Sequence, residues 1–400
     1  MTLKLFADDS LLKECTCHIT ACTEKNGVYL VETDQTVFFP EGGGQLSDRG
    51  QLGAAIVKHV SEKNGHIYHE CDQALEVGSE VKAKIDWSVR LDRMQQHCGE
   101  HLLSYACWKL YQANNVGFRM NEDIVTIDVD KELTTEQLLE IEHLTNELIW
   151  ENRPVSINYM DSTEAVCLKD RMRKFNDKLT GTLRIVTIED ADVCTCCGTH
   201  PPFTGMIGSV KIIRHEKHKQ GCRIEFLCGR RALLDADNKN TLLNAIAADF
   251  STKVEAVPEH LVKQKEEIAA LKENLKQKTH KLLELELNEK LSGAPVAADG
   301  IRVLCLPIVG GDGKESKLLL PRLSTLEKTV AVVLSVLPQR MSYVCVAGAA
   351  TDRDCREVIR TVNERFGGRG GGKPDCAQGG ADYCNDWQEK LQQVEEKLLG

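Results

Sequence analysis

The chain has 400 residues with 42% hydrophobic residues, so it can bury sizeable cores and should divide into about two to four domains. Its formal net charge of −10 argues against a protein that coats nucleic acid nonspecifically, although a local basic face is still compatible with it. The longest apolar runs, such as residues 329–337, are too short to span a bilayer and predict buried strands. An odd total of 17 cysteines and a first segment without a signal-peptide pattern predict a reducing, cytoplasmic location and no membrane partner.

Residues 1–90 have the pattern of a small all-β domain, and we expect a barrel-like fold. Two Lys-Asn-Gly segments, at 25–27 and 63–65, lie between β-prone runs and predict hairpin turns. Between these hairpins stand three consecutive glycines, Gly42, Gly43 and Gly44. Without Cβ atoms, their backbone can approach a ligand or another domain closely. A tight turn between two strands accounts for the same residues equally well.

A predicted second domain, residues 91–240, opens on a helix that carries two histidines. The apolar spacing between Trp87 and Trp108 is helical, and His97 and His101 lie four residues apart within it. Residues four apart on a helix lie one turn above each other, so the two imidazoles can converge on one ion. This pair is half of a possible zinc site.

The second half is a Cys-x-x-x-His segment, Cys196 to His200. A thiolate and further imidazoles suit Zn²⁺ far better than Ca²⁺ or Mg²⁺. Each half alone is weak evidence, since such pairs occur by chance in helices and in cysteine-rich chains. Together they predict one zinc ion per chain. Because Cys194 and Cys197 are adjacent to this segment, spacing alone leaves the thiolate ligand open between Cys196 and Cys197.

Strands and one capped helix connect the two halves. Alternating residues predict a strand at 123–130, and Thr134 has the sequence context of an N-cap for a helix that runs to about Trp150. Two further strands, beginning near residues 155 and 183, bracket a basic segment at 171–179 that we expect to be helical. The second of these strands leads directly toward Cys196.

Residues 205–231 reverse the charge of the chain locally. This stretch contains seven cations against Glu216 and Glu225 only: Lys211, Arg214, Lys217, Lys219, Arg223, Arg230 and Arg231. A basic flank beside a metal pocket would steer a polyanionic substrate. A strand edge that uses lysine and arginine to block aggregation is the alternative interpretation.

Residues 241–293 read as one long helix of lysine, glutamate and leucine. Leucine or isoleucine recurs every seven residues, at Leu261, Ile268, Leu275 and Leu282. The segment is therefore either a dimerising coiled coil or one arm of a helical hairpin, and its sequence does not choose between them.

Residues 294–400 alternate strands and helices and predict a small α/β domain. Its glycine-rich loop at 367–380 has a lysine, Lys373, at the spacing of a phosphate-binding P-loop. Pro374, however, occupies the place of the required serine or threonine, and the preceding segment reads as helix rather than strand. We therefore reject nucleotide binding here. Arg369 and Lys373 remain candidate contacts to an RNA backbone or a partner chain.

These motifs, taken together and in this order, resemble those of the alanyl-tRNA editing proteins, the freestanding relatives of the editing half of alanyl-tRNA synthetase. The resemblance is carried by RMQQHCGEHLL, CCGTHPPFTGMIG and FFPEGGGQLSDRG, and by the C-terminal GGRGGGKPDCAQGG. The metal-binding pattern of the family falls on His97, His101, Cys196 and His200. Cys197 stands where that motif usually has glycine, and Cys98 where it often has threonine or serine.

The resemblance implies an α+β multidomain protein: a β-barrel, an α/β zinc-containing editing domain, a coiled-coil segment and a C-terminal tRNA-binding or oligomerisation domain. It implies hydrolysis of the ester that links serine or glycine to mischarged alanine tRNA, and it is compatible with a homodimer. Gly42 to Gly44 are candidate substrate contacts. Thr126, Asp128 and Asp192 are candidates for reading the serine hydroxyl, with Asp192 also a candidate catalytic group. Four protein ligands suggest that zinc positions the substrate; direct activation of water is the alternative.

Glu100 sits between the two histidines and creates a rival interpretation. His-Cys-Gly-Glu-His fits the inverted zinc-peptidase motif, in which the glutamate is the general base. A peptidase would need a carboxylate as third ligand, whereas this chain supplies Cys-x-x-x-His. In a helix such a glutamate more often faces solvent. A third possibility is a non-catalytic, zinc-stabilised RNA-binding adaptor, which the cysteines at 98 and 197 keep open.

Overall fold

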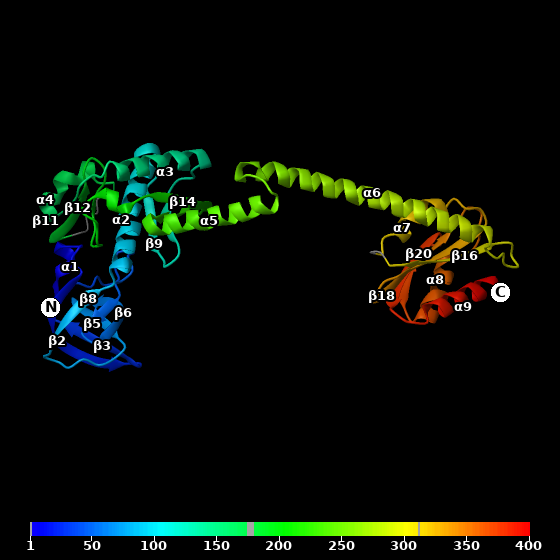
Figure 1. Ribbon diagram of the computed structural model, residues 1–400, viewed down its shortest axis with the longest axis horizontal. Helices are drawn as coiled ribbons and strands as arrows, with labels where there is room; N and C mark the ends of the chain where they lie inside the picture. The colour runs from blue at the N-terminus through cyan, green and yellow to red at the C-terminus, as the bar shows by residue number, and fades with distance from the viewer. Residues whose placement is uncertain (1, 174–179, 311–312) are drawn as a thin grey trace. The chain divides into compact units, whose positions relative to one another are not determined.

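The structure is a computed structural model that describes residues 2–173, 180–310 and 313–400. Its elements form two compact units, residues 1–245 and 246–400, each with several strands and helices (Figure 1). The mixed α+β architecture that the sequence predicts is therefore present. Within the described ranges, no helix combines the length and the apolar character needed to cross a membrane.

The N-terminal part of the first unit is a closed barrel in the strand order β2-β3-β7-β6-β5-β8, as predicted. Both Lys-Asn-Gly segments form hairpin turns in which the asparagine and the glycine have positive φ, because that backbone matches the twist of the flanking strands. Two short strands and a helical turn flank the barrel. The elements are β1 (Leu3–Lys4), α1 (Leu5–Asp8), β2 (Glu14–Lys25), β3 (Val28–Thr33), β4 (Gln35–Thr36), β5 (Gly50–Leu52), β6 (Ala55–Lys63), β7 (His66–Cys71) and β8 (Glu80–Ile85).

A buried ion pair joins this barrel to the helix that follows it, α2 (Trp87–Tyr111). The guanidinium of Arg90 donates from Nε to both carboxylate oxygens of Asp48 at 3.0 Å, and both side chains are completely buried. Arg90 also donates to the carbonyl oxygens of Ser10 and Val37. A buried charge pair is tolerated only when its remaining donors are satisfied, as they are here. The barrel and α2 are consequently one packed body.

Helix α2 and a second helix cover one face of a four-stranded sheet in the order β14-β15-β10-β9. The second helix starts at the predicted place, since Thr134 and Gln137 form a capping box. On the sheet, Val125, Ile127 and Val129 alternate toward the helices. The elements are β9 (Asn115–Met120), β10 (Val125–Val129), α3 (Thr135–Trp150), β14 (Val210–His218) and β15 (Gly221–Cys228).

A three-stranded antiparallel sheet, in the order β11-β12-β13, brings the chain to Cys196. Its last strand ends one residue before that cysteine. The basic segment predicted to be helical falls mostly on residues 174–179, which lie outside the described residues. The elements are β11 (Val155–Asp161), α4 (Ser162–Ala165), η1 (Val166–Arg171), β12 (Thr182–Ile188), β13 (Val193–Thr195) and η2 (Thr204–Ile207).

The predicted single helix at 241–293 is wrong in its first part. The chain forms α5 (Gly229–Asp249), a break with the short turn η3 (Val254–Ala256), and then α6 (Val257–Ser292). Pro258 lies in the first turn of α6, where its missing N–H is not needed, and so marks a new start. The heptad residues Leu261, Ile268, Leu275 and Leu282 are all exposed. Only the last turns of α6 pack on the C-terminal sheet.

That C-terminal sheet has five strands in the order β16-β17-β18-β20-β19, with helices against both faces. The glycine-rich segment after α8 forms the antiparallel hairpin β19–β20, whereas a P-loop joins a strand to a helix. The elements are β16 (Arg302–Val309), α7 (Ser316–Leu323), β17 (Thr329–Val336), β18 (Arg340–Ala347), α8 (Cys355–Phe366), β19 (Arg369–Gly372), β20 (Cys376–Asp382) and α9 (Trp387–Leu399).

Candidate metal centre

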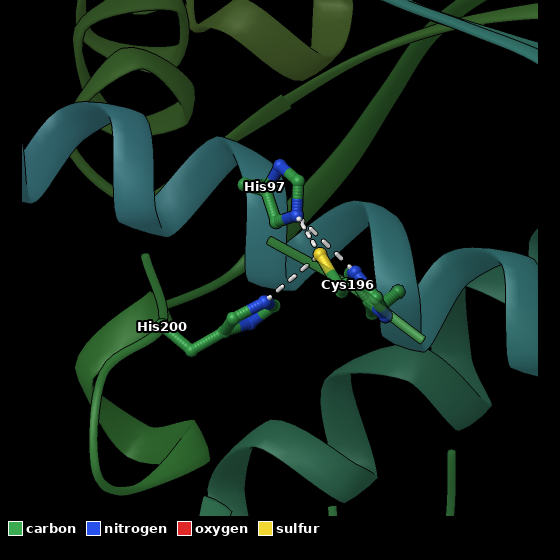
Figure 2. A group of neighbouring side chains, drawn as sticks. His97, Cys196 and His200 are labelled. Carbon is green, nitrogen blue, oxygen red and sulfur yellow. Dashed lines mark hydrogen bonds between the residues drawn. The ribbon is translucent and has the colours of Figure 1, made fainter. Parts of the chain in front are cut away.

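Four side chains meet where α2 passes the turn that follows β13. His97 and His101 project from one face of the helix, and Cys196 and His200 come from the turn. Their ligand atoms all lie within 4.8 Å of one another, and all four residues are largely shielded from solvent. Figure 2 shows the imidazoles of His97 and His200 both pointing toward the sulfur of Cys196. The two halves recognised in the sequence therefore come together in space.

Two of the three separations between these atoms match those around one tetrahedral cation, and the third, between His97 and Cys196, is about 0.3 Å shorter than the range expected around zinc. The Nε2 atom of His97 is 3.0 Å from Cys196 Sγ and 3.3 Å from His101 Nε2. His200 Nε2 is 3.4 Å from the same sulfur. Around zinc, bonds of about 2.05 Å to nitrogen and about 2.3 Å to sulfur place tetrahedral ligands roughly 3.3–3.6 Å apart. The borderline-soft donors and their spacing together fit Zn²⁺.

The protonation states of Cys196 and His200 also suit a metal ligand. Burial opposes ionisation of Cys196, but the adjacent imidazoles of His97 and His200 outweigh it and hold the pKa of the thiol well below its ordinary value. Burial lowers the pKa of His200 to about 3, so its ring is neutral near neutral pH. A thiolate and a neutral imidazole are the forms that bind metal.

Asp192 orients His101 from behind. Its Oδ2 accepts a hydrogen bond from His101 Nδ1 at 2.9 Å, and Arg173 donates to both of its carboxylate oxygens, at 2.6 and 2.9 Å. Although burial opposes it, Arg173 and His101 hold the pKa of Asp192 well below its usual range. A carboxylate that accepts a hydrogen bond from Nδ1 favours the tautomer with its proton on that atom, in which Nε2 is available to bind an ion. Asp192 is not among the residues that line the neighbouring cleft.

Cys194 lies beside the same histidine. Its Sγ is 3.2 Å from His101 Nδ1, and His101, Asp192 and Cys194 form a second group within bonding reach of one ion. Burial raises the pKa of the Cys194 thiol to about 11, the opposite direction to that of Cys196. The cluster of four is the better metal site, because it offers four ligand atoms where the other group offers three.

The structure also separates Cys196 from its competitors. Cys196 lies among the histidine nitrogens, whereas Cys197 is exposed. Cys98 is fully buried in the core on another face of α2, and burial raises the pKa of its thiol to about 12. The two departures from the family motif thus leave the four-residue group intact.

The barrel holds the turn that carries Cys196 and His200. Gln45 is fully buried; its Nε2 donates to Thr199 Oγ1 at 2.8 Å, and its Oε1 accepts from the Thr199 N–H at 3.0 Å. Ser10 donates to the carbonyl oxygen of His200 at 2.6 Å. From β12, Arg184 donates to the carbonyl oxygens of Cys196 and Gly198. Long-range contacts from two separate elements thus fix this turn.

Two glycines allow the close packing around His97. A Cβ atom on Gly198 would lie 2.8 Å from Gln45 Oε1 and from His97 Nε2. Gly44 has φ +85°, and a Cβ there would lie 2.5 Å from the ring of Phe118, which packs edge-on against His97. The Gly42–Gly44 stretch is also a tight turn, with paired hydrogen bonds between Gly42 and Gln45. Both interpretations of the glycine run therefore hold: a turn that also approaches the next domain.

A cleft of about 510 Å³ opens over the metal-binding group. Residues from α2, β9, β13 and the glycine turn line it: Gly43, His97, Glu100, His101, Trp108, Asn114, Asn115, Val116, Phe118, Arg173, Cys194, Thr195 and Cys196. Its size is that of a small-molecule site. The metal-binding group is thus accessible to a ligand.

Glu100 lies inside this cleft, so the expectation that it faces solvent is wrong. The side chain is buried, and its Oε1 accepts hydrogen bonds from Ser104 Oγ at 2.6 Å and Asn115 Nδ2 at 2.7 Å. Its Oε2 lies 4.0 Å from His101 Nε2. One carboxylate oxygen is thereby anchored, and the other faces the metal-binding group.

Thr126 and Asp128 do not reach the cleft. The core-facing residues of β10 point toward α2, so the alternation of the strand sends these two to the opposite face. There Arg223 donates to both carboxylate oxygens of Asp128, at 2.7 and 2.8 Å. These two candidates for reading a substrate hydroxyl are therefore displaced from the site.

Arg369 and Lys373 lie in the second unit, at the β19–β20 hairpin, and both are exposed. The basic stretch at 205–231 belongs to the first unit and is largely neutralised by ion pairs: Lys211–Glu142, Arg214–Glu216, Lys217–Glu132, Arg223–Asp128 and Arg231–Asp92. Much of this stretch is β14, an edge strand, where charged side chains discourage further pairing. The strand-edge interpretation of these cations gains support.

The comparisons with known proteins agree with this geometry. The family model described as the threonyl and alanyl tRNA synthetase second additional domain matches residues 183–225, which include Cys196 and His200. Alanyl-tRNA editing protein AlaX-L of Pyrococcus horikoshii is 29% identical over 95% of this chain and 94% of its own length. Alanyl-tRNA editing protein Aarsd1 of Rattus norvegicus is 32% identical over 56% of this chain and 58% of its own.

Longer proteins match as well. The alanine–tRNA ligase of Thermococcus kodakarensis is 30% identical over the whole of this chain, which spans only 44% of that enzyme. The crystal structure of the C-Ala domain from Aquifex aeolicus alanyl-tRNA synthetase matches 26% of this chain and 96% of its own, with 24% identity and a TM-score of 0.24. The homology thus extends over most of the chain.

Proposed function

From the homology of this chain with the alanyl-tRNA editing proteins, we propose that it is a zinc-dependent aminoacyl-tRNA deacylase. It hydrolyses the ester that links serine, or glycine, to mischarged alanine tRNA. The observation that carries the proposal is the group of His97, His101, Cys196 and His200 at the base of an open cleft. Similarity over nearly the full length of AlaX-L supports the same activity.

These four donors would hold one zinc ion, which would supply positive charge to the site. Because the protein offers four ligands, the residues of the cleft would carry the proton transfers. Glu100 is the candidate base, since its Oε2 is free while Ser104 and Asn115 hold its Oε1. It takes a proton from water as the water oxygen attacks the carbonyl carbon. The ester C–O bond then breaks, and the leaving ribose oxygen takes up the proton and becomes a hydroxyl.

The remaining predictions stand as parts of this proposal. Discrimination against correctly charged alanine comes from polar groups that are unpaired without a serine hydroxyl. The exposed Arg369 and Lys373 contact the tRNA backbone, and the exposed leucines of α6 mediate a homodimer. The chain has four domains in this proposal. They are a β-barrel domain (1–90), an editing domain (91–240), a helical linker (241–293) and a C-terminal domain for tRNA binding or oligomerisation (294–400). The reducing, cytoplasmic location predicted from the sequence is part of the same proposal.

The deciding experiment measures zinc content and deacylation in the same preparations. Wild type, His97→Ala and Cys197→Ser are assayed on seryl-, glycyl- and alanyl-tRNA for alanine. We expect about one zinc per chain, release of serine but not of alanine, and loss of both zinc and activity in His97→Ala only. Cys197→Ser is the matched control, because Cys197 is exposed.

Other results of this experiment would favour one of the alternative functions. Cleavage of peptides would favour the inverted-motif peptidase, and tight tRNA binding without turnover would favour the adaptor. A zinc-free preparation with full activity would contradict the mechanism.

A further inference from the structure

The cleft is also lined by a tryptophan that lies further along α2 than the two histidines. Trp108 is on α2, 11 residues after His97 and 7 after His101, so the helical period places all three on one face. At 1.5 Å per residue, Trp108 lies about 10 Å along the helix from His101. All three line the same cleft. A ligand seated at the histidines can therefore extend along α2 to the indole.

A second apolar side chain lines the same cleft. Val116 on β9 lines the cleft and is 62% exposed, although valine is usually buried. Next to it, Asn114 is anchored by its Nδ2, which donates to Asp130 Oδ2 at 2.8 Å. A flat aromatic surface, a branched aliphatic side chain and a fixed amide thus line the same cleft as the metal-binding group.

Resting on the proposed function, we propose that Trp108 and Val116 hold the terminal adenine of the tRNA between them. The ester to be cleaved is on the terminal ribose, so the base lies one sugar ring beyond the reacting carbonyl. Enzymes that act on a single nucleotide commonly hold its base between aromatic and apolar side chains. The distance between His101 and Trp108 suits a ribose followed by a purine.

The shape of the cleft favours a nucleoside over other apolar ligands. A volume of about 510 Å³ accommodates one aminoacyl nucleoside and excludes a duplex. Trp108 is preorganised, because the ring of Tyr105 lies against it with centroids 6.1 Å apart. A fixed aromatic surface loses little conformational entropy when a base stacks on it. The Trp108–Val116 pair is therefore a binding site for the base and has no part in the bond-breaking step.

The test compares Trp108→Ala, Trp108→Phe and the control Trp150→Ala, whose indole is 66% exposed and outside the cleft. Each full-length variant is assayed on seryl-tRNA and on serine methyl ester, which carries no base. Stacking of one base contributes roughly 1–3 kcal/mol, so Trp108→Ala should raise KM for seryl-tRNA about 5- to 150-fold. Trp108→Phe should recover most of this loss, and Trp150→Ala should match wild type.

The ester substrate separates stacking from a general structural defect. We expect the loss in Trp108→Ala to be at least tenfold larger on seryl-tRNA than on serine methyl ester. Equal losses on both substrates, or an unchanged KM for seryl-tRNA, would overturn the inference. Direct binding of a CCA trinucleotide, followed by quenching of tryptophan fluorescence, keeps the test independent of activity. If the trinucleotide quenches the fluorescence of the wild type but not that of Trp108→Ala, the base site is supported, even if the wild type does not deacylate tRNA. If the quenching persists in Trp108→Ala, the base site is contradicted.

Discussion

The helix half and the turn half of the metal-binding group are held in place by different means. His97 and His101 owe their alignment to the period of α2 and to one anchor, Asp192. The turn with Cys196 and His200 depends on contacts from residues far away in sequence, chiefly Gln45 and Ser10 in the barrel. The first half is set locally and the second by tertiary structure. Substitutions in the barrel should therefore disturb one half of the site and spare the other.

The largest effect is expected when the turn half loses its thiolate. Replacement Cys196→Ser should abolish stoichiometric zinc and lower kcat/KM for seryl-tRNA by more than about 10²-fold, beyond the 10- to 100-fold typical of residues that only support a ligand. Zinc analysis and single-turnover deacylation measure both effects. Cys197→Ser, at the neighbouring exposed position, should keep zinc and activity. Comparable losses in the two variants would contradict the choice of Cys196.

The second-largest effect is expected at the buried ion pair that joins the barrel to α2. Asp48→Asn leaves the buried guanidinium of Arg90 without its counter-charge, and we expect a loss of about 3–5 kcal/mol in the free energy of unfolding. Urea unfolding followed by circular dichroism measures it. Glu41→Gln is the control, because Glu41 is an exposed acid in the same domain. A loss below about 1 kcal/mol would show that the barrel and α2 do not depend on this pair.

A fourth buried imidazole, outside the metal group, tests what burial alone does to histidine. His69 lies in the barrel, where its Nδ1 donates to the Val31 carbonyl and Thr36 Oγ1 contacts its Nε2. Burial lowers the pKa of His69 to about 4 from an ordinary value near 6.5. Between these values the unfolded chain binds a proton that the folded chain does not. Stability is therefore fully present above about pH 6.5 and falls as the pH drops toward 4, by roughly 3 kcal/mol at most.

Unfolding free energies at pH 7 and pH 4.5 measure this loss. His69→Gln should reduce the difference between the two pH values, because it removes the titrating group. An equal difference in wild type and His69→Gln would assign the acid sensitivity to other groups.

The smallest effect is expected from a substitution in the barrel that touches only the turn half of the metal-binding group. Gln45→Ala removes both hydrogen bonds to Thr199 and should weaken zinc affinity about 10- to 100-fold, as other supporting residues do. A zinc-competition titration measures the affinity. Gln51→Ala, in the same barrel but exposed, is the control. Affinity that is unchanged in Gln45→Ala would mean that the turn holds its shape without the barrel.

The same contrast explains what the sequence could predict. The Asn-Gly turns, the capping box at Thr134 and the pairing of His97 with His101 depend on residues close together in the chain, and all were visible as local patterns. The choice of Cys196 over Cys197, the burial of Glu100 and the outward direction of Asp128 depend on packing across the sheet. The roles of Ser10, Arg173, Arg184 and Trp108 had no local signal. Gln45 alone stood next to a recognised motif, the glycine run.

In the helical region the sequence predicted too much regular structure. Composition predicted one helix from residue 241, whereas the heptad residues begin only at Leu261, after the break. The break coincides with Pro258 in the first turn of the second helix, a position that proline prefers. Composition does not change at this break, so it could not reveal it.

The contact between Gln45 and Thr199 spans 154 positions of the chain, and this has a consequence for biosynthesis. At ribosomal rates of 5–20 residues per second, Gln45 is made roughly 8–30 s before its partner. The barrel can therefore fold before Thr199 is synthesised, with the side-chain amide of Gln45 already in place. When Cys196 emerges, its turn docks onto a surface that already exists. Metal capture then becomes a late step of maturation, which protects the nascent thiols from binding metal before the site is assembled.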